Sequence, residues 1–215
     1  MASSLIHIAV AKELEKKILK ERNIKIKKKY DYYLGSIAPD LARQIGGSKY
    51  EAHFFKNSSK ENVPNIDLFV KKYPNFKSNS FDLGYFTHLY VDKLWSEEIL
   101  NKIIENNSIK LLDGTILKTT KEEEIKEILY SDYTNLNIQL IDEYSLDLSL
   151  FYEEFRKPKT AINQIPVEYL DILINKMGII IENSKTEKSY SIEIEAVKDF
   201  IKDAVDKIEK ELEKY

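Results

Sequence analysis

All three histidines of this 215-residue chain lie within its first 88 residues, at His7, His53 and His88. Two aspartates, Asp40 and Asp92, fall in the same part of the chain. Neutral imidazole and carboxylate together suit zinc, iron, manganese or nickel. The chain has no cysteine, which excludes disulfides and thiolate ligation. The residue types therefore indicate a metal site built from histidine and carboxylate ligands.

His88 and Asp92 are four residues apart within a predicted helix over residues 82–95. This spacing is about one helical turn, so both side chains point the same way, together with Tyr85 and Trp95. A carboxylate on an apolar face is costly to bury unless it is paired or binds a metal. Taken alone, the pair fits a hydrogen-bonded core pair as well as a pair of metal ligands.

His7 lies on the apolar face of a second predicted helix, over residues 5–20, that Ser3 or Ser4 caps. Val10, Ala11, Leu14 and Ile18 recur at helical spacing and share this face with His7. A single inward histidine is more often a core residue that is hydrogen-bonded to the backbone than a ligand. The conjunction of all three histidines with two aspartates is what favours a metal site.

Asp40 and His53 belong to irregular segments between the two helices. Pro39 suits the first turn of a short helix that continues to residue 44, and Gly46-Gly47 ends it. His53 follows in a loop or short helix over residues 51–55. These two side chains would complete a four-ligand set from separate loops.

Four sequence elements resemble the zinc-dependent phospholipase C family, a group of phospholipase C/P1 nuclease-like helical metal hydrolases. They occur in the family's order and spacing over roughly residues 5–95. The elements are His-Ile-Ala at 7–9, Leu-Gly-Ser-Ile-Ala-Pro-Asp at 34–40, His53-Phe54, and Gly-Tyr-Phe-Thr-His-Leu-Tyr-Val-Asp at 84–92. The specific parts are Gly-Ser-x-x-Pro-Asp and Gly-x-x-x-His-x-x-x-Asp.

The resemblance implies a division of the ligands between two metals. Asp40, His53, His88 and Asp92 match four ligands of one metal, and His7 matches a ligand of a second metal that Asp92 bridges. Secreted members bind a third metal through two further histidines and a glutamate, but no histidine follows His88 here. We therefore expect one or two ions of zinc or another divalent transition metal.

The activity that the resemblance implies is hydrolysis of a phosphoester by a metal-activated water, with Asp40 as the catalytic proton acceptor. The substrate would be a small-molecule or lipid phosphoester. One alternative, the HD-type phosphohydrolases, requires a His-Asp dipeptide that the chain lacks. Another is a non-catalytic helical module with a structural or vestigial metal site that acts as an interaction protein. It would have a closed site rather than an open one.

The amino-acid composition limits the kinds of partner and the cellular location that we expect. Hydrophobic residues make up 43% of the chain, and 33 basic residues against 36 acidic ones give a net charge of -3. This balance gives no reason to expect a nucleic-acid partner. No apolar segment is long enough to span a membrane, and a start without a basic region predicts a cytoplasmic protein. The oligomeric state is not set by the sequence.

The periodicity predicts an all-α, multi-helix fold as one domain over residues 1–215. Residues 1–95 carry the expected ligands, and residues 96–215 form a helical second half. Further helices are predicted at 67–73, 121–144, 148–155, 167–180 and 192–213, with an exposed loop at 57–65. An Asp-Gly pair between two apolar runs predicts a β-hairpin near residues 109–118.

Additional side chains are candidates for the pocket. Tyr32, Tyr33, Lys49 and Tyr85 lie in the half that carries the expected ligands. In the second half, the polar run at residues 131–135 predicts a kink or loop in its helix, or a segment that lines the pocket.

Overall fold

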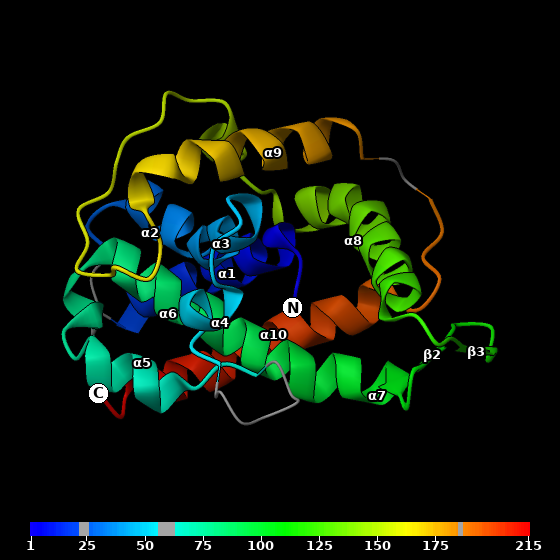
Figure 1. Cartoon of the computed structure of the whole chain (residues 1–215). Helices are drawn as coiled ribbons and strands as arrows, with labels where there is room; N and C mark the ends of the chain where they lie inside the picture. Colours follow the sequence, from blue (N-terminus) through cyan, green and yellow to red (C-terminus); the bar gives the residue numbers. More distant parts are fainter. Residues whose placement is uncertain (22–25, 56–62, 185–186) are drawn as a thin grey trace.

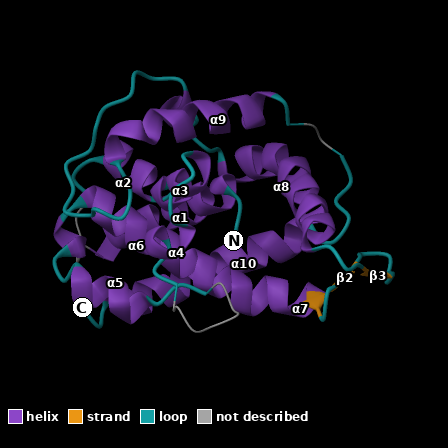
Figure 2. Ribbon diagram, in the orientation of Figure 1, coloured by secondary structure: helices purple, strands orange, loops and turns teal. Residues whose placement is uncertain are grey.

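The computed structural model describes residues 1–21, 26–55, 63–184 and 187–215. This part of the chain is mainly helical, with one small antiparallel sheet at the edge of the helical body (Figure 1; Figure 2). The predicted all-α fold with a small hairpin is confirmed. The loop predicted at 57–65 falls mostly outside the described residues.

Helix α6 (Ser80–Trp95) is the buried centre of the fold, and every one of its residues except Lys93 is buried. The side chain of Asn79 caps it by accepting hydrogen bonds from the backbone N–H groups of Phe81 and Asp82. A helix that is apolar on nearly all sides must be covered on all sides. It packs against α1, α2, α5 and α10, so His88 and Asp92 lie deep inside the protein.

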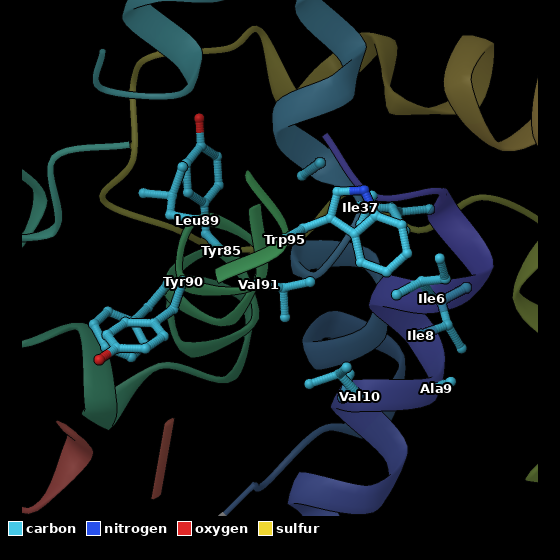
Figure 3. Close-up of a cluster of buried hydrophobic side chains, with 14 of the residues drawn as sticks. Ile6, Ile8, Ala9, Val10, Ile37, Tyr85, Leu89, Tyr90, Val91 and Trp95 are labelled. Atoms are coloured by element: carbon cyan, nitrogen blue, oxygen red, sulfur yellow. The ribbon is translucent and has the colours of Figure 1, made fainter. Parts of the chain in front are cut away.

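Helix α1 (Ser4–Glu21) packs against α6 and α10 (Ile194–Leu212). Val91 and Trp95 of α6 point toward the side of α1 that carries Ile6 and Val10, whereas Tyr90 points away from it (Figure 3). The Oγ atom of Ser3 accepts a hydrogen bond from the backbone N–H of Ile6 at 3.3 Å, which confirms the predicted cap. The inward face of α1 therefore lies against the helix that carries His88.

Helix α2 (Lys29–Gly35) crosses α6 at very short range through two glycines. A Cβ atom on Gly84 would lie 2.1 Å from the carbonyl oxygen of Tyr32. A Cβ atom on Gly35 would lie 2.1 Å from the carbonyl oxygen of Phe81. Because side-chain atoms cannot approach a backbone this closely, the crossing requires glycine at both positions.

The remaining elements of the first half are short. They are a 3-10 turn at Ala38–Asp40, α3 (Leu41–Gln44), α4 (Lys49–Ala52), α5 (Ile66–Lys72) and a 3-10 turn at Phe76–Ser78. Pro39 lies in the first turn, as predicted. Gly46 adopts a φ of +68° just after α3, which ends that helix where the sequence predicts.

A π-helical turn (Ser96–Leu100) extends α6 into α7 (Asn101–Ile103), and the small sheet follows. Strand β1 (Ile104–Glu105) pairs with β2 (Ser108–Lys110), which pairs with β3 (Ile116–Lys118). The predicted hairpin is therefore confirmed, and β1 adds a strand that the sequence reading did not predict.

The second half is built from α8 (Glu122–Tyr144), α9 (Leu170–Glu182) and α10. A 3-10 turn at Val167–Tyr169 leads into α9. The helix predicted at 148–155 is wrong: only a 3-10 turn forms at Ser149–Phe151, because one turn suffices to bury Leu150 and Phe151 beside α9. Within the described ranges, no helix has both the length and the apolar composition needed to cross a bilayer.

Candidate metal centre

The structure brings together all five side chains that the sequence singled out. Three of the pairs involve Asp92, whose Oδ1 lies 3.3 Å from Nε2 of His7 and whose Oδ2 lies 3.3 Å from Nε2 of His88 and 3.6 Å from Nε2 of His53. Nε2 of His53 also lies 3.6 Å from Oδ1 of Asp40. The cluster is thus centred on the carboxylate that α6 presents one turn after His88.

Each side chain is positioned by its own element. The His7 imidazole stacks on that of His88, with ring centroids 3.9 Å apart, because α1 and α6 pack face to face. Asp40 ends the 3-10 turn that begins at Ala38, and His53 directly follows α4. Four of the five side chains are at most 1% exposed, whereas that of Asp40 is 16% exposed.

Backbone carbonyl groups fix the tautomers of two histidines. Nδ1 of His88 lies 2.9 Å from the carbonyl oxygen of Ser36, and Nδ1 of His53 lies 3.2 Å from that of Lys49. A carbonyl oxygen only accepts hydrogen bonds, so each Nδ1 carries the proton and each Nε2 of a neutral ring carries a lone pair. The two Nε2 atoms face each other at 3.3 Å. Two lone pairs at this distance require a proton or a metal cation between them.

His7 and Asp92 have further buried atoms without a hydrogen bond among the described residues. Neither ring nitrogen of His7 has a hydrogen-bond partner there, and neither does Oδ2 of Asp92. Nε2 of His7 lies near Oδ1 of Asp92, but without hydrogen-bond geometry, and this Oδ1 instead accepts a hydrogen bond from the backbone N–H of Ala2 at 2.9 Å. Buried polar atoms are rarely left in this state, and metal ligation satisfies them.

The charges within the cluster act strongly on one another. Burial raises the pKa of Asp92, but the charge of His88 and the adjacent His7 imidazole outweigh it and hold this pKa well below its usual range. Burial lowers the pKa of His88, but the charge of Asp92 outweighs it and raises this pKa. Burial and the charge of His88 lower the pKa of His7. For Asp40, the adjacent His53 and the charge of His88 outweigh burial, so its pKa is lowered. Ionised carboxylates beside imidazole are the donor set that a transition metal prefers.

Two groups of ligand atoms are compact enough to hold an ion. One consists of His7, His88 and Asp92, and the other of Asp40, His53 and His88, with the ligand atoms of each group within 4.8 Å of one another. His88 is common to both groups. By position, the family pattern instead assigns Asp92 as the bridge between two metals.

A cavity of about 560 Å³ opens beside the cluster, and Asp40 lines it. Much of its wall is apolar and comes from the second half, including Leu100, Ile125 and Ile180. Of the other candidates, Lys49 lines the cavity, and so do Tyr133 and Thr134 of the polar run on α8. The centre therefore has an open side, formed where the two halves of the chain meet.

Residues 6–95 match the family model described as zinc dependent phospholipase C. Over this segment the chain is similar to the zinc-dependent phospholipase C family. The match confirms the resemblance and covers every residue of the candidate centre. Together with the His/Asp cluster, it supports a metal-dependent hydrolase at the level of the family. No curated protein and no solved structure gives a significant match to the chain.

Three tyrosines that the sequence made candidates for the pocket have other contacts in the structure. The hydroxyl group of Tyr85 donates to the carbonyl oxygen of Ala52, and that of Tyr33 donates to Glu15. Tyr32 is fully buried in the core. None of the three is among the described residues that line the cavity.

The polar run does not interrupt α8, so the loop predicted there is wrong. The buried carboxylate of Asp132 accepts hydrogen bonds from the backbone N–H groups of Tyr190, Ser191 and Ile192 and from the hydroxyl group of Ser191. This part of the run anchors the chain that leads into α10. The sequence reading missed the backbone carbonyls of Ser36 and Lys49, which no side-chain pattern reports.

Proposed function

We propose that this protein is a metal-dependent phosphoester hydrolase. His7, Asp40, His53, His88 and Asp92 would hold one or two ions of zinc or another divalent transition metal. The observation that carries this proposal is the pair of Nε2 atoms of His53 and His88, which face each other at 3.3 Å while both Nδ1 atoms are bonded to carbonyls. A transition metal between them satisfies both lone pairs.

A bound zinc ion would lower the pKa of a water molecule and polarise a phosphoryl oxygen. The chain's own residues supply the remaining functions. The carbonyls of Ser36 and Lys49 orient the imidazoles of His88 and His53 and fix their tautomers. Asp40 lines the cavity and is the most exposed of the five side chains, so it is the group that is placed to accept a proton from the attacking water.

The cavity supports a substrate with an apolar part. Apolar side chains from the π-helical turn, β1, α8 and α9 line the wall, and a volume of about 560 Å³ is in the range of pockets that enclose small organic ligands. We therefore propose a lipid or other small-molecule phosphoester with an apolar group. The open side also favours a catalytic site over the closed structural site of a non-catalytic module.

Elemental analysis provides the first test. The protein is purified without added metal and without a histidine tag, beside the His88→Ala and Thr87→Ala variants. Thr87 is the matched control, because it is buried on α6 but its Oγ1 is bonded to the carbonyl oxygen of Leu83 within the helix. We expect one or two equivalents of a transition metal in the wild type and in Thr87→Ala, and none in His88→Ala.

The same proteins are then assayed against phosphate monoesters and diesters, including lipid ones. We expect turnover by the wild type and Thr87→Ala, and its loss in His88→Ala. Stoichiometric metal retained in His88→Ala would contradict the ligand assignment. Metal without any turnover would instead support the non-catalytic module.

A further inference from the structure

The cavity beside the candidate centre carries an excess of positive charge. Four cationic side chains line it, against the carboxylates of Asp40 and Glu122. The cations are Arg43, Lys49, Lys126 and Lys176. Lys49 is partly buried and the other three are exposed, and together they give the lining a net positive charge that attracts anions into the cavity. The cavity is thus suited to a ligand with a negatively charged head.

Lys49 is tied to the centre by both its backbone and its side chain. Its carbonyl oxygen accepts hydrogen bonds from the backbone N–H of His53 at 3.0 Å and from Nδ1 of the same residue at 3.2 Å. Its ammonium group lies 5.4 Å from the ring centroid of Phe55, and this ring stacks on the His53 imidazole. The side chain of Lys49 is therefore held at the edge of the metal centre.

Arg43 is held at the same cavity by an aromatic partner. It lies in α3, three residues after Asp40, and its guanidinium group lies 4.8 Å from the ring centroid of Tyr130. Nη1 also donates a hydrogen bond to the hydroxyl group of Tyr130. These contacts fix the plane of the guanidinium group and use few of its five N–H donors. A fixed guanidinium group is well suited to two oxygens of one phosphate.

The other two cations already have partners. The ammonium group of Lys126 lies 2.9 Å from a carboxylate oxygen of Glu122, and that of Lys176 donates to the side-chain oxygen of Gln44 at 2.6 Å. The ammonium group of Lys49 contacts a ring face, and within the part of the chain that the structure describes no salt bridge or hydrogen bond engages it. Lys49 and Arg43 are therefore the cations with donors to offer a ligand beside Asp40.

We propose that Lys49 and Arg43 form an anion subsite that binds the non-bridging oxygens of the substrate's phosphoryl group next to the metal centre. This inference rests on the proposed function and deepens it. The subsite selects phosphoesters by their anionic oxygens, so esters with a terminal, doubly charged phosphate bind more tightly than diesters with the same apolar group. The apolar wall then contacts the rest of the substrate.

Calorimetric titration with inorganic phosphate tests the subsite directly. The zinc-loaded wild type is compared with Lys49→Gln, Lys49→Arg and Arg43→Gln, and with Lys110→Gln as a control on the exposed side of β2. Loss of one charge-assisted hydrogen bond weakens binding by about tenfold or more. We expect this loss in Lys49→Gln and Arg43→Gln, but not in Lys49→Arg or the control, with zinc content unchanged throughout.

Two results would overturn the subsite. One is phosphate affinity in Lys49→Gln equal to that of the wild type. The other is loss of zinc from Lys49→Gln, which would make Lys49 a support of the metal centre. Phosphoester turnover by the wild type separates the two proposals. If the wild type turns over phosphoesters but Lys49→Gln binds phosphate as tightly as the wild type, only the subsite is contradicted. If phosphate binding depends on Lys49 but no phosphoester is turned over, the subsite is supported and the proposed hydrolase activity is contradicted.

Discussion

Substitution of Gly84 by alanine tests whether the crossing of α2 and α6 positions the metal centre. The new Cβ atom would lie 2.1 Å from the carbonyl oxygen of Tyr32, whereas real Cβ contacts essentially never fall below 3.0 Å. The two helices must therefore separate by about 1 Å in a closely packed interior. Forced overpacking of this kind costs about 1–3 kcal/mol or more. For a chain of this length, we expect Tm to fall by roughly 2–12 °C.

The same shift should weaken metal binding, because the carbonyl of Ser36 directly follows α2 and orients His88. Loss of such a support typically reduces metal affinity about 10–100-fold. Gly178→Ala is the matched control. Its Cβ atom would meet no neighbour closer than 3.6 Å, and it removes a glycine from the interior of α9. That change is expected to stabilise the protein by about 0.5–1 kcal/mol.

Differential scanning calorimetry and a competition assay with a zinc-binding dye measure the two effects. The reasoning predicts opposite shifts of Tm for the two alanine variants, and a loss of zinc affinity in Gly84→Ala alone. Equal Tm values for wild type and Gly84→Ala would refute the close crossing. A lower Tm with unchanged zinc affinity would refute the link between the crossing and His88.

Three further predictions concern the metal and the second half of the chain. In the zinc-loaded protein, with free zinc at least 100-fold above its Kd, bound zinc should stabilise the fold by about 3 kcal/mol or more. Removal of zinc by a chelator should therefore lower Tm, and added zinc should restore it. An unchanged Tm would contradict the metal site. The raised pKa of His88 makes protons compete with zinc for its Nε2 at higher pH than for an ordinary imidazole, so zinc affinity should fall as pH falls through that raised pKa. Calorimetric titration of zinc in buffers of different ionisation enthalpy should detect the released proton. A heat of zinc binding that is the same in every buffer would contradict proton release. Asp132→Asn turns an amide N–H₂ group toward backbone donors and should destabilise the protein by about 2–3 kcal/mol in urea unfolding, whereas the exposed Asp142→Asn should change little.

Local sequence pattern was sufficient for the parts of the site that lie on long helices. The four-residue spacing of His88 and Asp92 and the apolar stripe around His7 follow from the period of the α-helix alone. The partners Asp40 and His53 lie in short irregular segments without a period, so their residue types made them candidate ligands and the family pattern assigned them to the same centre. The structure brings all five together, and their roles as ligands stay a prediction.

The features that the sequence did not predict depend on tertiary contacts, which a sequence pattern does not report. The carbonyl groups of Ser36 and Lys49 belong to the backbone, which is the same in every residue. The residue types at these positions therefore do not predict which imidazole each carbonyl binds. The helix predicted at 148–155 is reduced to one turn because packing beside α9 outweighs local propensity. For the same reason, the polar run around Asp132 is compatible with an unbroken helix once its carboxylate finds backbone donors.

The two halves of the chain have different tasks in this arrangement. Residues 6–95 supply every candidate ligand and both side chains of the proposed anion subsite, so in the proposed function they would set the chemistry at phosphorus. Residues from the π-helical turn, β1, α8 and α9 supply the apolar wall, so in the proposed function they would determine which organic group fits beside the phosphate. Substitutions at Ile125 or Ile180 should therefore change the preference among substrates without removing metal, whereas substitutions at His88 should remove both.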